Sequence, residues 1–225
     1  MKVKSMMTAA AFLSALSAGA EVSMSFGVGG QAYKTPVTDI TVSNFEKDVT
    51  VKSSKTKSPV IIGLKNRTSL TTGVSGSIRI NVRAMDRRGG NFMPTTWSGG
   101  TEQGSIHGIA SGWGVSDDMI PNGAIQAGEA LILTFDLSGL TLPDGASVIL
   151  KRILFFEENA VGRNGSIWLR DPKIEAGKSG AAVRIAKDIV TFSGNLAVTD
   201  GMQLALTRGT VDTRLLEMDI DIVQR

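Results

Sequence analysis

Short segments in which apolar and polar side chains alternate recur along most of this chain. The clearest covers residues 77–85, with the sequence SIRINVRAM. Its two sets of side chains are Ile78, Ile80, Val82 and Ala84 on one side and Arg79, Asn81 and Arg83 on the other. A period of two residues is typical of a β-strand with one face in a core and the other in water.

Comparable apolar or alternating segments cover residues 39–51, 60–64, 130–137, 147–156 and 166–171. Glycine-rich and proline-containing turns separate them. Lys151 and Arg152 interrupt one apolar run, which indicates a bulge in that strand. Together these patterns predict an all-β protein, built as an antiparallel, jelly-roll-like β-sandwich.

The C-terminal part, residues 180–225, alternates as well, most clearly at residues 216–222. Short turns separate its segments, which favours a C-terminal meander. A meander either completes the main sandwich or forms a small appended sheet. We expect completion because so short a meander has little core of its own. Residues 21–225 are therefore predicted to form one domain.

The first twenty residues have the pattern of a secretory signal peptide. Lys2 and Lys4 give a basic start, residues 6–16 are apolar, and residues 18–20 read Ala-Gly-Ala, a small-residue cleavage site. A short N-terminal helix of the fold is the alternative. The pattern predicts a signal peptide at residues 1–20 and a secreted protein that is extracellular, at the cell surface or periplasmic. An exported protein without cysteine and with a short signal that begins with lysines favours a bacterial source over a disulfide-rich eukaryotic module.

Charge argues against nucleic acid as a partner. Without Lys2 and Lys4 there are 22 basic residues against 21 acidic ones, a net charge of about +1, and so weak a field gives no reason to expect nucleic acid. Basic residues crowd the first half of the chain, from Lys47 to Arg88. A solvated face explains them, and a contact surface for an anionic polymer of the cell wall or matrix is the alternative. No stretch after the first twenty residues predicts a transmembrane helix.

Candidate ligand-binding residues follow the strand at residues 77–85. Residues 86–111 lose the alternation, and loops of this length are usually functional or mobile. Trp97 lies in this segment, and two interpretations of it stay open. It either stacks on the apolar face of a sugar ring or packs against the end of the sandwich. Trp113, in the next turn, is a second candidate for a sugar contact. His107 is the only histidine in the sequence, which excludes a metal site built from several histidines. It is interpreted either as a solvated loop residue or as a further contact to the sugar ligand of Trp97 and Trp113.

Three acidic residues near Trp113 are candidates for a calcium site, namely Asp117, Asp118 and Glu129. Calcium takes several oxygen ligands, and a turn with clustered carboxylates supplies them. The alternative is that these acids cap turn amides and solvate the bend. The spacing is not that of an EF-hand loop. Calcium is the one candidate cofactor that the sequence offers.

Residues 112–137 carry a resemblance to a known group of proteins. The segments that carry it are Gly112-Trp113-Gly114-Val115, Asp117-Asp118-Met119-Ile120, Gly128-Glu129-Ala130-Leu131 and Leu133-Thr134-Phe135-Asp136. The resemblance is to exported bacterial PEP-CTERM-type proteins, in which a GLGV turn precedes an acidic segment, Ile-Asp-x-x-Glu-x-Leu, and an alternating strand. The resemblance implies an antiparallel β-sandwich with an extracellular or cell-surface role. The final residues, DIDIVQR, do not contain that group's Pro-Glu-Pro sorting motif.

A second, weaker resemblance lies at residues 166–171. SIWLRD is similar to the closing strand of jelly-roll carbohydrate-binding modules. Trp168 is then either a core residue or part of a binding platform, and its apolar neighbours favour the core.

Two functions of different classes follow as hypotheses. The first is a secreted, non-catalytic module that binds a glycan or another extracellular or cell-surface polymer. The second is a structural or assembly protein of the bacterial surface that associates with itself or a partner. A glycoside hydrolase-like enzyme ranks third. Its paired acids, Glu157 and Glu158, are neighbours on a strand and face opposite sides, so no catalytic residues are predicted.

Overall fold

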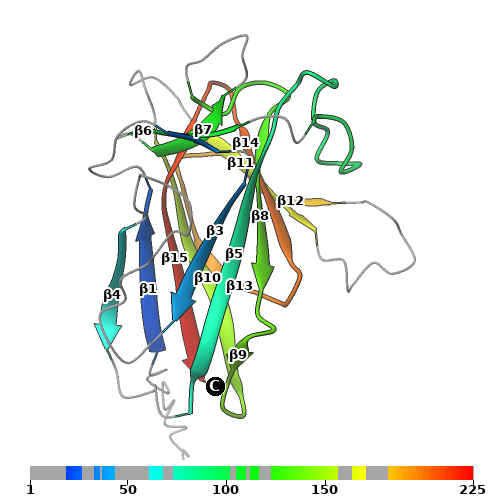
Figure 1. Ribbon diagram of the computed structural model, residues 1–225. Coiled ribbons are helices and arrows are strands. Elements are labelled where there is room, and N and C mark those ends of the chain that lie inside the picture. The colour runs from blue at the N-terminus through cyan, green and yellow to red at the C-terminus, as the bar shows by residue number, and fades with distance from the viewer. Residues whose placement is uncertain are drawn as a thin grey trace, which may run out of the picture.

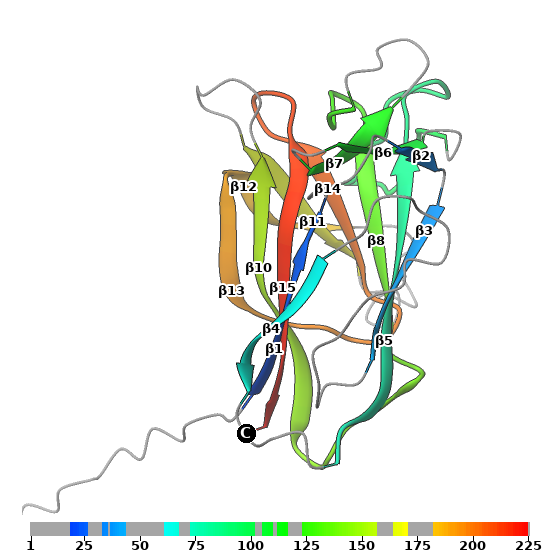
Figure 2. The ribbon, with the colours of Figure 1, turned by 60° about the vertical axis from the view of Figure 1, so that its left-hand side comes forward.

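Two antiparallel β-sheets packed against each other make up the protein (Figures 1 and 2). This computed structural model describes residues 19–26, 33–35, 37–43, 61–67, 73–101, 105–109, 112–116, 123–156, 164–170 and 182–224. The predicted all-β fold and antiparallel β-sandwich are confirmed. Strands and turns account for all of the regular structure in these ranges, which hold no helix able to span a bilayer.

The eight-stranded sheet is organised around its C-terminal strand. The order is β13-β10-β15-β7-β6-β2, with β1 also paired to β15 and β4 paired to β1. Its strands are β1 (Gly19–Ser25), β2 (Tyr33–Thr35), β4 (Ile61–Arg67), β6 (Ser105–Ile109), β7 (Gly112–Ser116), β10 (Ala146–Phe156), β13 (Thr191–Ala197) and β15 (Arg214–Gln224). In both views β6 and β7 lie across one end of the sandwich (Figures 1 and 2).

The seven-stranded sheet has the order β12-β11-β14-β8-β5-β3, and the short β9 pairs with β5. Its strands are β3 (Val37–Ser43), β5 (Ser75–Met85), β8 (Ala130–Asp136), β9 (Leu140–Thr141), β11 (Gly165–Arg170), β12 (Val183–Ile189) and β14 (Gln203–Arg208). The alternation that predicted strands at residues 77–85 and 130–137 reappears as strands β5 and β8.

The main core lies between the two sheets. On β5, Ile78, Ile80 and Val82 are fully buried, and Met218 and Ile220 of β15 belong to the same cluster from the opposite sheet. Complete burial of such a side chain stabilises the fold by about 1.5–3 kcal/mol. The period of two therefore sets which face of each strand is inside, and the other face of the seven-stranded sheet remains available for a site.

The predicted bulge in β10 is confirmed, because the pairing register shifts between Leu150 and Arg152. The two cations at this point meet acids of β15. Lys151 Nζ lies 3.3 Å from Asp221 Oδ2, and Arg152 Nε lies 3.3 Å from Asp219 Oδ2. The polar interruption of this apolar strand therefore serves ion pairing between neighbouring strands.

The C-terminal strands do not form the predicted meander. β12 and β14 belong to the seven-stranded sheet, whereas β13 and β15 belong to the eight-stranded sheet. Consecutive strands thus cross between the sheets instead of pairing with each other, and the prediction of a meander is wrong. A turn signal shows where the chain reverses, but it does not show which strand becomes the partner. This part of the chain is integral to both sheets.

Strand β1 begins at Gly19, within the range predicted as a signal peptide. Gly19 and Ala20 pair with Val223 and Ile222 of β15. Residues 1–18 lie outside the described ranges. Cleavage after Ala20 leaves residues 21–25 of β1 in place, and the processing site stays a prediction.

Candidate functional site

Two rows of side chains cross the outer face of the seven-stranded sheet. Pairing register brings the members of each row side by side, because residues directly opposite on neighbouring strands share a face. The polar row contains Asp39, Asn81, Thr134, Gln203 and Arg170. The mixed row, two residues further along the strands, contains Arg83, Ile132, Ala205, Trp168 and Arg184.

Hydrogen bonds run along the polar row. Asn81 Nδ2 donates to Asp39 Oδ1 at 2.8 Å, and Gln203 Nε2 donates to Thr134 Oγ1 at 3.2 Å. At the end of the row, Arg170 Nη1 lies 3.5 Å from Gln203 Oε1. These contacts hold polar side chains in fixed directions on strands that cannot shift independently. The row is therefore oriented before a ligand arrives.

A folded loop, residues 86–101, covers part of the mixed row. Its base is held by the fully buried Asp86, whose carboxylate accepts hydrogen bonds from the Arg88 backbone at 3.1 Å and the Thr101 hydroxyl at 2.5 Å. Arg88 Nε also donates to this carboxylate. Asp86 and Thr101 exchange two backbone hydrogen bonds as well. The two ends of the loop are therefore fastened to each other.

The tip of this loop places an aromatic pair over the sheet. Phe92 N donates to Gly128 O at 2.8 Å, and Met93 pairs with Ser98 in an isolated bridge. Trp97, inside that bridge, has a backbone φ of 51°. A side-chain-bearing residue in this left-handed region costs of order 1 kcal/mol or more, and such residues gather at ligand sites.

Trp97 is half-buried between two neighbours. Its ring meets Phe92 edge to face, with centroids 5.6 Å apart and planes at 78°. The guanidinium carbon of Arg170 lies 5.5 Å from the Trp97 centroid, within cation–π range. Trp97 lines a pocket, whereas Trp113 and His107, the other two ligand-binding candidates from the sequence, line neither of the two pockets described below.

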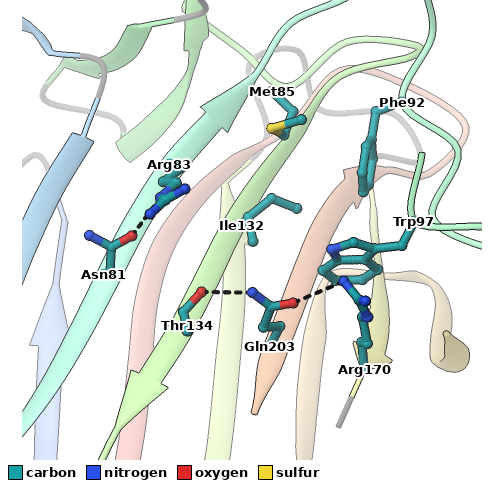
Figure 3. Close-up of a pocket in the computed structure, with 9 residues that line it drawn as sticks. All are labelled: Asn81, Arg83, Met85, Phe92, Trp97, Ile132, Thr134, Arg170 and Gln203. Atoms are coloured by element: carbon teal, nitrogen blue, oxygen red, sulfur yellow. Dashed lines mark hydrogen bonds between the residues drawn. The ribbon is translucent and has the colours of Figure 1, made fainter. Parts of the chain in front are cut away.

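We call this pocket, about 460 Å³ in volume, the Trp97 pocket (Figure 3). It is lined by Asn81, Arg83, Met85, Phe92, Trp97, Ile132, Thr134, Arg170 and Gln203. Phe92 and Trp97 form an aromatic wall that overhangs the sheet, and the polar row provides the floor (Figure 3). Arg83 on β5 and Arg170 on β11 stand on opposite sides, because β8 and β14 lie between their strands.

An adjoining pocket of about 340 Å³, which we call the Trp168 pocket, shares Phe92 with the first. Trp168 is half-buried there, and the guanidinium carbon of Arg184 lies 5.1 Å from its centroid. Trp168 packs on a small cluster around Phe92 and Ile132, on the outer side of the sheet. The interpretation of Trp168 as a residue of the main core is therefore wrong.

Asp136 is an acid on the same sheet face, two residues beyond Thr134 of the polar row and opposite Arg79 of β5. The hydroxyl of Ser138, at 2.5 Å, and its backbone N–H, at 2.9 Å, hold the pKa of Asp136 below its ordinary value. Arg79 Nη1 lies 4.0 Å from Asp136 Oδ2 and acts in the same direction. Asp136 is thus ionised at neutral pH and balances Arg79.

Trp113 is not a loop residue. It lies in β7, is completely buried, and contacts Phe26 edge to face with centroids 4.8 Å apart. Its indole therefore has no surface on which a sugar could stack, and its assignment as a ligand contact is corrected to a core residue. The glycines on either side suggested a turn, but they serve close packing. A Cβ on Gly114 would lie 1.9 Å from Gly123 O.

His107 also lies in a strand instead of a loop. It is half-buried in β6, opposite Lys34 of β2 and Gly114 of β7. A Cβ on Gly123 would lie 2.1 Å from its Nδ1, so the ring packs directly against that glycine. His107 therefore lies in the strand β6 that crosses one end of the sandwich, and it lines neither the Trp97 pocket nor the Trp168 pocket described above.

The calcium candidates are only partly described. Glu129 is buried, and its Oε2 accepts a hydrogen bond from Gln126 N at 2.9 Å, which is the turn-capping role named as the alternative. Asp117 and Asp118 lie outside the described residues, as do Glu157 and Glu158. Within the described ranges, no group of three or more acidic or histidine residues is arranged to hold a metal. Calcium binding stays a prediction.

Sequence reasoning missed most of the pocket. Arg170, Gln203 and Thr134 come from three strands whose order could not be read from the sequence. The available signal was the outward position of each residue in its alternation, which marks the exposed face without placing the strands side by side.

Comparisons with known proteins add nothing to this picture. No protein-family model matches the chain, and neither curated proteins nor solved structures gave a match.

Proposed function

We propose that this protein is a non-catalytic module that binds a glycan, or a chemically similar extracellular polymer, on the outer face of the seven-stranded sheet. The observation that carries the proposal is the Trp97 pocket, in which an aromatic wall faces a row of amide, hydroxyl and guanidinium groups. A sugar ring presents an apolar CH face and several hydroxyl groups, and this combination of surfaces is suited to both.

The backbone of Trp97 supports a binding role. A loop that needs a left-handed residue normally uses glycine or asparagine at that position, because a Cβ is disfavoured there. This loop instead carries a large aromatic ring at a φ of 51° and leaves it half-buried at the pocket. Strain of this kind persists where the surrounding structure fixes it, and it is common at ligand contacts.

The two adjoining pockets favour an extended ligand. They meet at Phe92, and each contains a tryptophan with an arginine close to its ring. A polymer that crosses Phe92 would contact both tryptophans, whereas a single sugar would fill one pocket. The groups on the floor of the Trp97 pocket donate and accept hydrogen bonds at neutral pH without exchanging protons, which supports binding instead of catalysis.

Replacement of Trp97 by alanine is expected to weaken polymer binding about 10- to 100-fold. The change removes an aromatic contact whose burial by a ligand contributes about 1.5–3 kcal/mol. Affinity electrophoresis or isothermal titration calorimetry with a panel of neutral and acidic polysaccharides measures the effect.

The matched control is Met93→Ala, in the same loop but outside both pockets, where the side chain is 54% exposed. This variant should bind like the parent protein. Retention of no polysaccharide by the parent protein, or equal binding by both variants, would exclude the proposed function at this pocket.

Self-association is a second candidate, favoured by the edge strand β13. In the described structure, β13 pairs only with β10 and contains no charged residue, although edge strands usually carry charges that prevent edge-to-edge pairing. A register shift in its pairing, next to Gly194 and Asn195, limits the regular part of this edge.

If β13 joins copies of the chain, Thr191→Lys is expected to convert an oligomer into a monomer. Sedimentation velocity over a range of concentrations measures this, and a parent protein that is monomeric throughout excludes the candidate.

A further inference from the structure

We propose that the Trp97 pocket selects acidic polymers, and that a carboxylate or sulfate group of the polymer binds to Arg170. The inference rests on the proposed glycan-binding function and adds the charge class of the ligand. A guanidinium group presents its N–H donors in one plane, and this arrangement matches the oxygens of a carboxylate or a sulfate.

Arg170 provides the strongest part of the argument. It is half-buried on β11, and its hydrogen bond to Gln203 Oε1 is long, at 3.5 Å. Its other described contact is the Trp97 ring, 5.5 Å from the guanidinium carbon. Neither contact neutralises the charge, and Arg170 has no carboxylate partner within the described residues. An arginine beside an aromatic ring keeps N–H groups for a ligand.

Arg83 stands on the other side of the pocket, and its side chain already has partners. Its Nε donates to Asn81 Oδ1 at 2.9 Å, while Asn81 Nδ2 donates to Asp39 Oδ1 at 2.8 Å. The amide of Asn81 therefore stands between the arginine and the acid of the polar row, and Asp39 does not line the pocket. No acid is among the described residues that line the pocket, so Arg170 places a positive charge beside the aromatic wall.

The Trp168 pocket gives an internal comparison. It also places an arginine near a tryptophan, at 5.1 Å, but its lining includes two acids, Glu129 and Asp188, beside Arg184 and Arg208. Among the described residues, the formal charges of the Trp168 pocket therefore balance, whereas no acid lines the Trp97 pocket beside Arg170. We accordingly place the anionic group of the polymer in the Trp97 pocket and an uncharged part of it in the Trp168 pocket.

The test compares polymers and variants that differ only in charge. Dextran, carboxymethyl-dextran and dextran sulfate share one backbone, and alginate and polygalacturonate add natural uronates. The parent protein is expected to bind at least one acidic polymer ten times or more tightly than dextran, with affinity that falls as salt rises. Arg170→Gln should reduce this affinity about 10- to 100-fold and reduce the binding of dextran much less, because dextran has no anionic group for the guanidinium to bind.

Arg79→Gln is the matched control. It removes the same charge from the same sheet face, but Arg79 lies outside both pockets and faces Asp136. An equal loss of affinity in Arg79→Gln and Arg170→Gln would show non-specific attraction and overturn the inference. Carboxymethyl-dextran and dextran sulfate separate the two sources of negative charge, and binding of either through Arg170 supports the inference.

The outcomes also separate this inference from the proposed function. Equal binding of dextran and its acidic derivatives, dependent on Trp97 but not on Arg170, keeps the glycan site and overturns the acidic selectivity. A protein that retains none of these polymers overturns both. Thermal unfolding of each variant at the same pH confirms that the compared proteins are equally folded.

Discussion

Replacement of Trp113 by alanine is expected to lower the free energy of unfolding by about 3–5 kcal/mol. The side chain is completely buried in β7 and packs edge to face on Phe26, so the variant leaves a large cavity at the end of the sandwich. Small domains are stable by only about 5–15 kcal/mol in total. Urea-induced unfolding followed by circular dichroism measures the change.

Trp113→Phe is the matched control, because it keeps an aromatic ring in the same space and should cost much less. Polymer binding per folded molecule should be unchanged in both variants. If Trp113→Ala kept its stability and lost binding, Trp113 would be a ligand contact after all, and the buried position described above would be contradicted.

Replacement of Asp86 by alanine is expected to destabilise the protein by about 2–4 kcal/mol and to abolish polymer binding. The buried carboxylate accepts hydrogen bonds from Arg88 and Thr101, and its loss leaves these donors without their acceptor. The same change releases the base of the loop that carries Phe92 and Trp97. Chemical denaturation gives the stability, and calorimetric titration with the best-bound polysaccharide gives the affinity.

Thr96→Ala tests whether this effect is particular to the base of the loop. Thr96 is exposed at the tip, where its hydroxyl lies 2.7 Å from that of Ser98. Its loss should cost less than about 1 kcal/mol and leave affinity close to that of the parent protein. Normal binding by Asp86→Ala would show that the anchored loop does not form the site.

Alternation along the strands was sufficient to predict the sandwich. In β5, the buried residues are those that the period of two places on the inner face, and the bulge at Lys151 follows from a polar break in an apolar run. Both features depend on local sequence alone. The crossing of β12 to β15 between sheets was missed because it depends on which strands pair, and turn residues carry no such information.

The tryptophans show a similar limit. Trp97 was correctly placed on a loop, but Trp113 and Trp168 were assigned to the wrong environments. A glycine on each side of Trp113 predicts a turn, whereas Gly114 is required because Gly123 O approaches it closely. Trp168 has apolar neighbours in sequence, yet those neighbours point into the main core while Trp168 itself points out.

The left-handed backbone of Trp97 places a local strain at the position whose ring forms the pocket wall. Glycine there would relieve the backbone strain, but it would remove the ring that packs on Phe92 and Arg170. Under the proposed function, the loop keeps a locally unfavourable conformation because the ring is needed there.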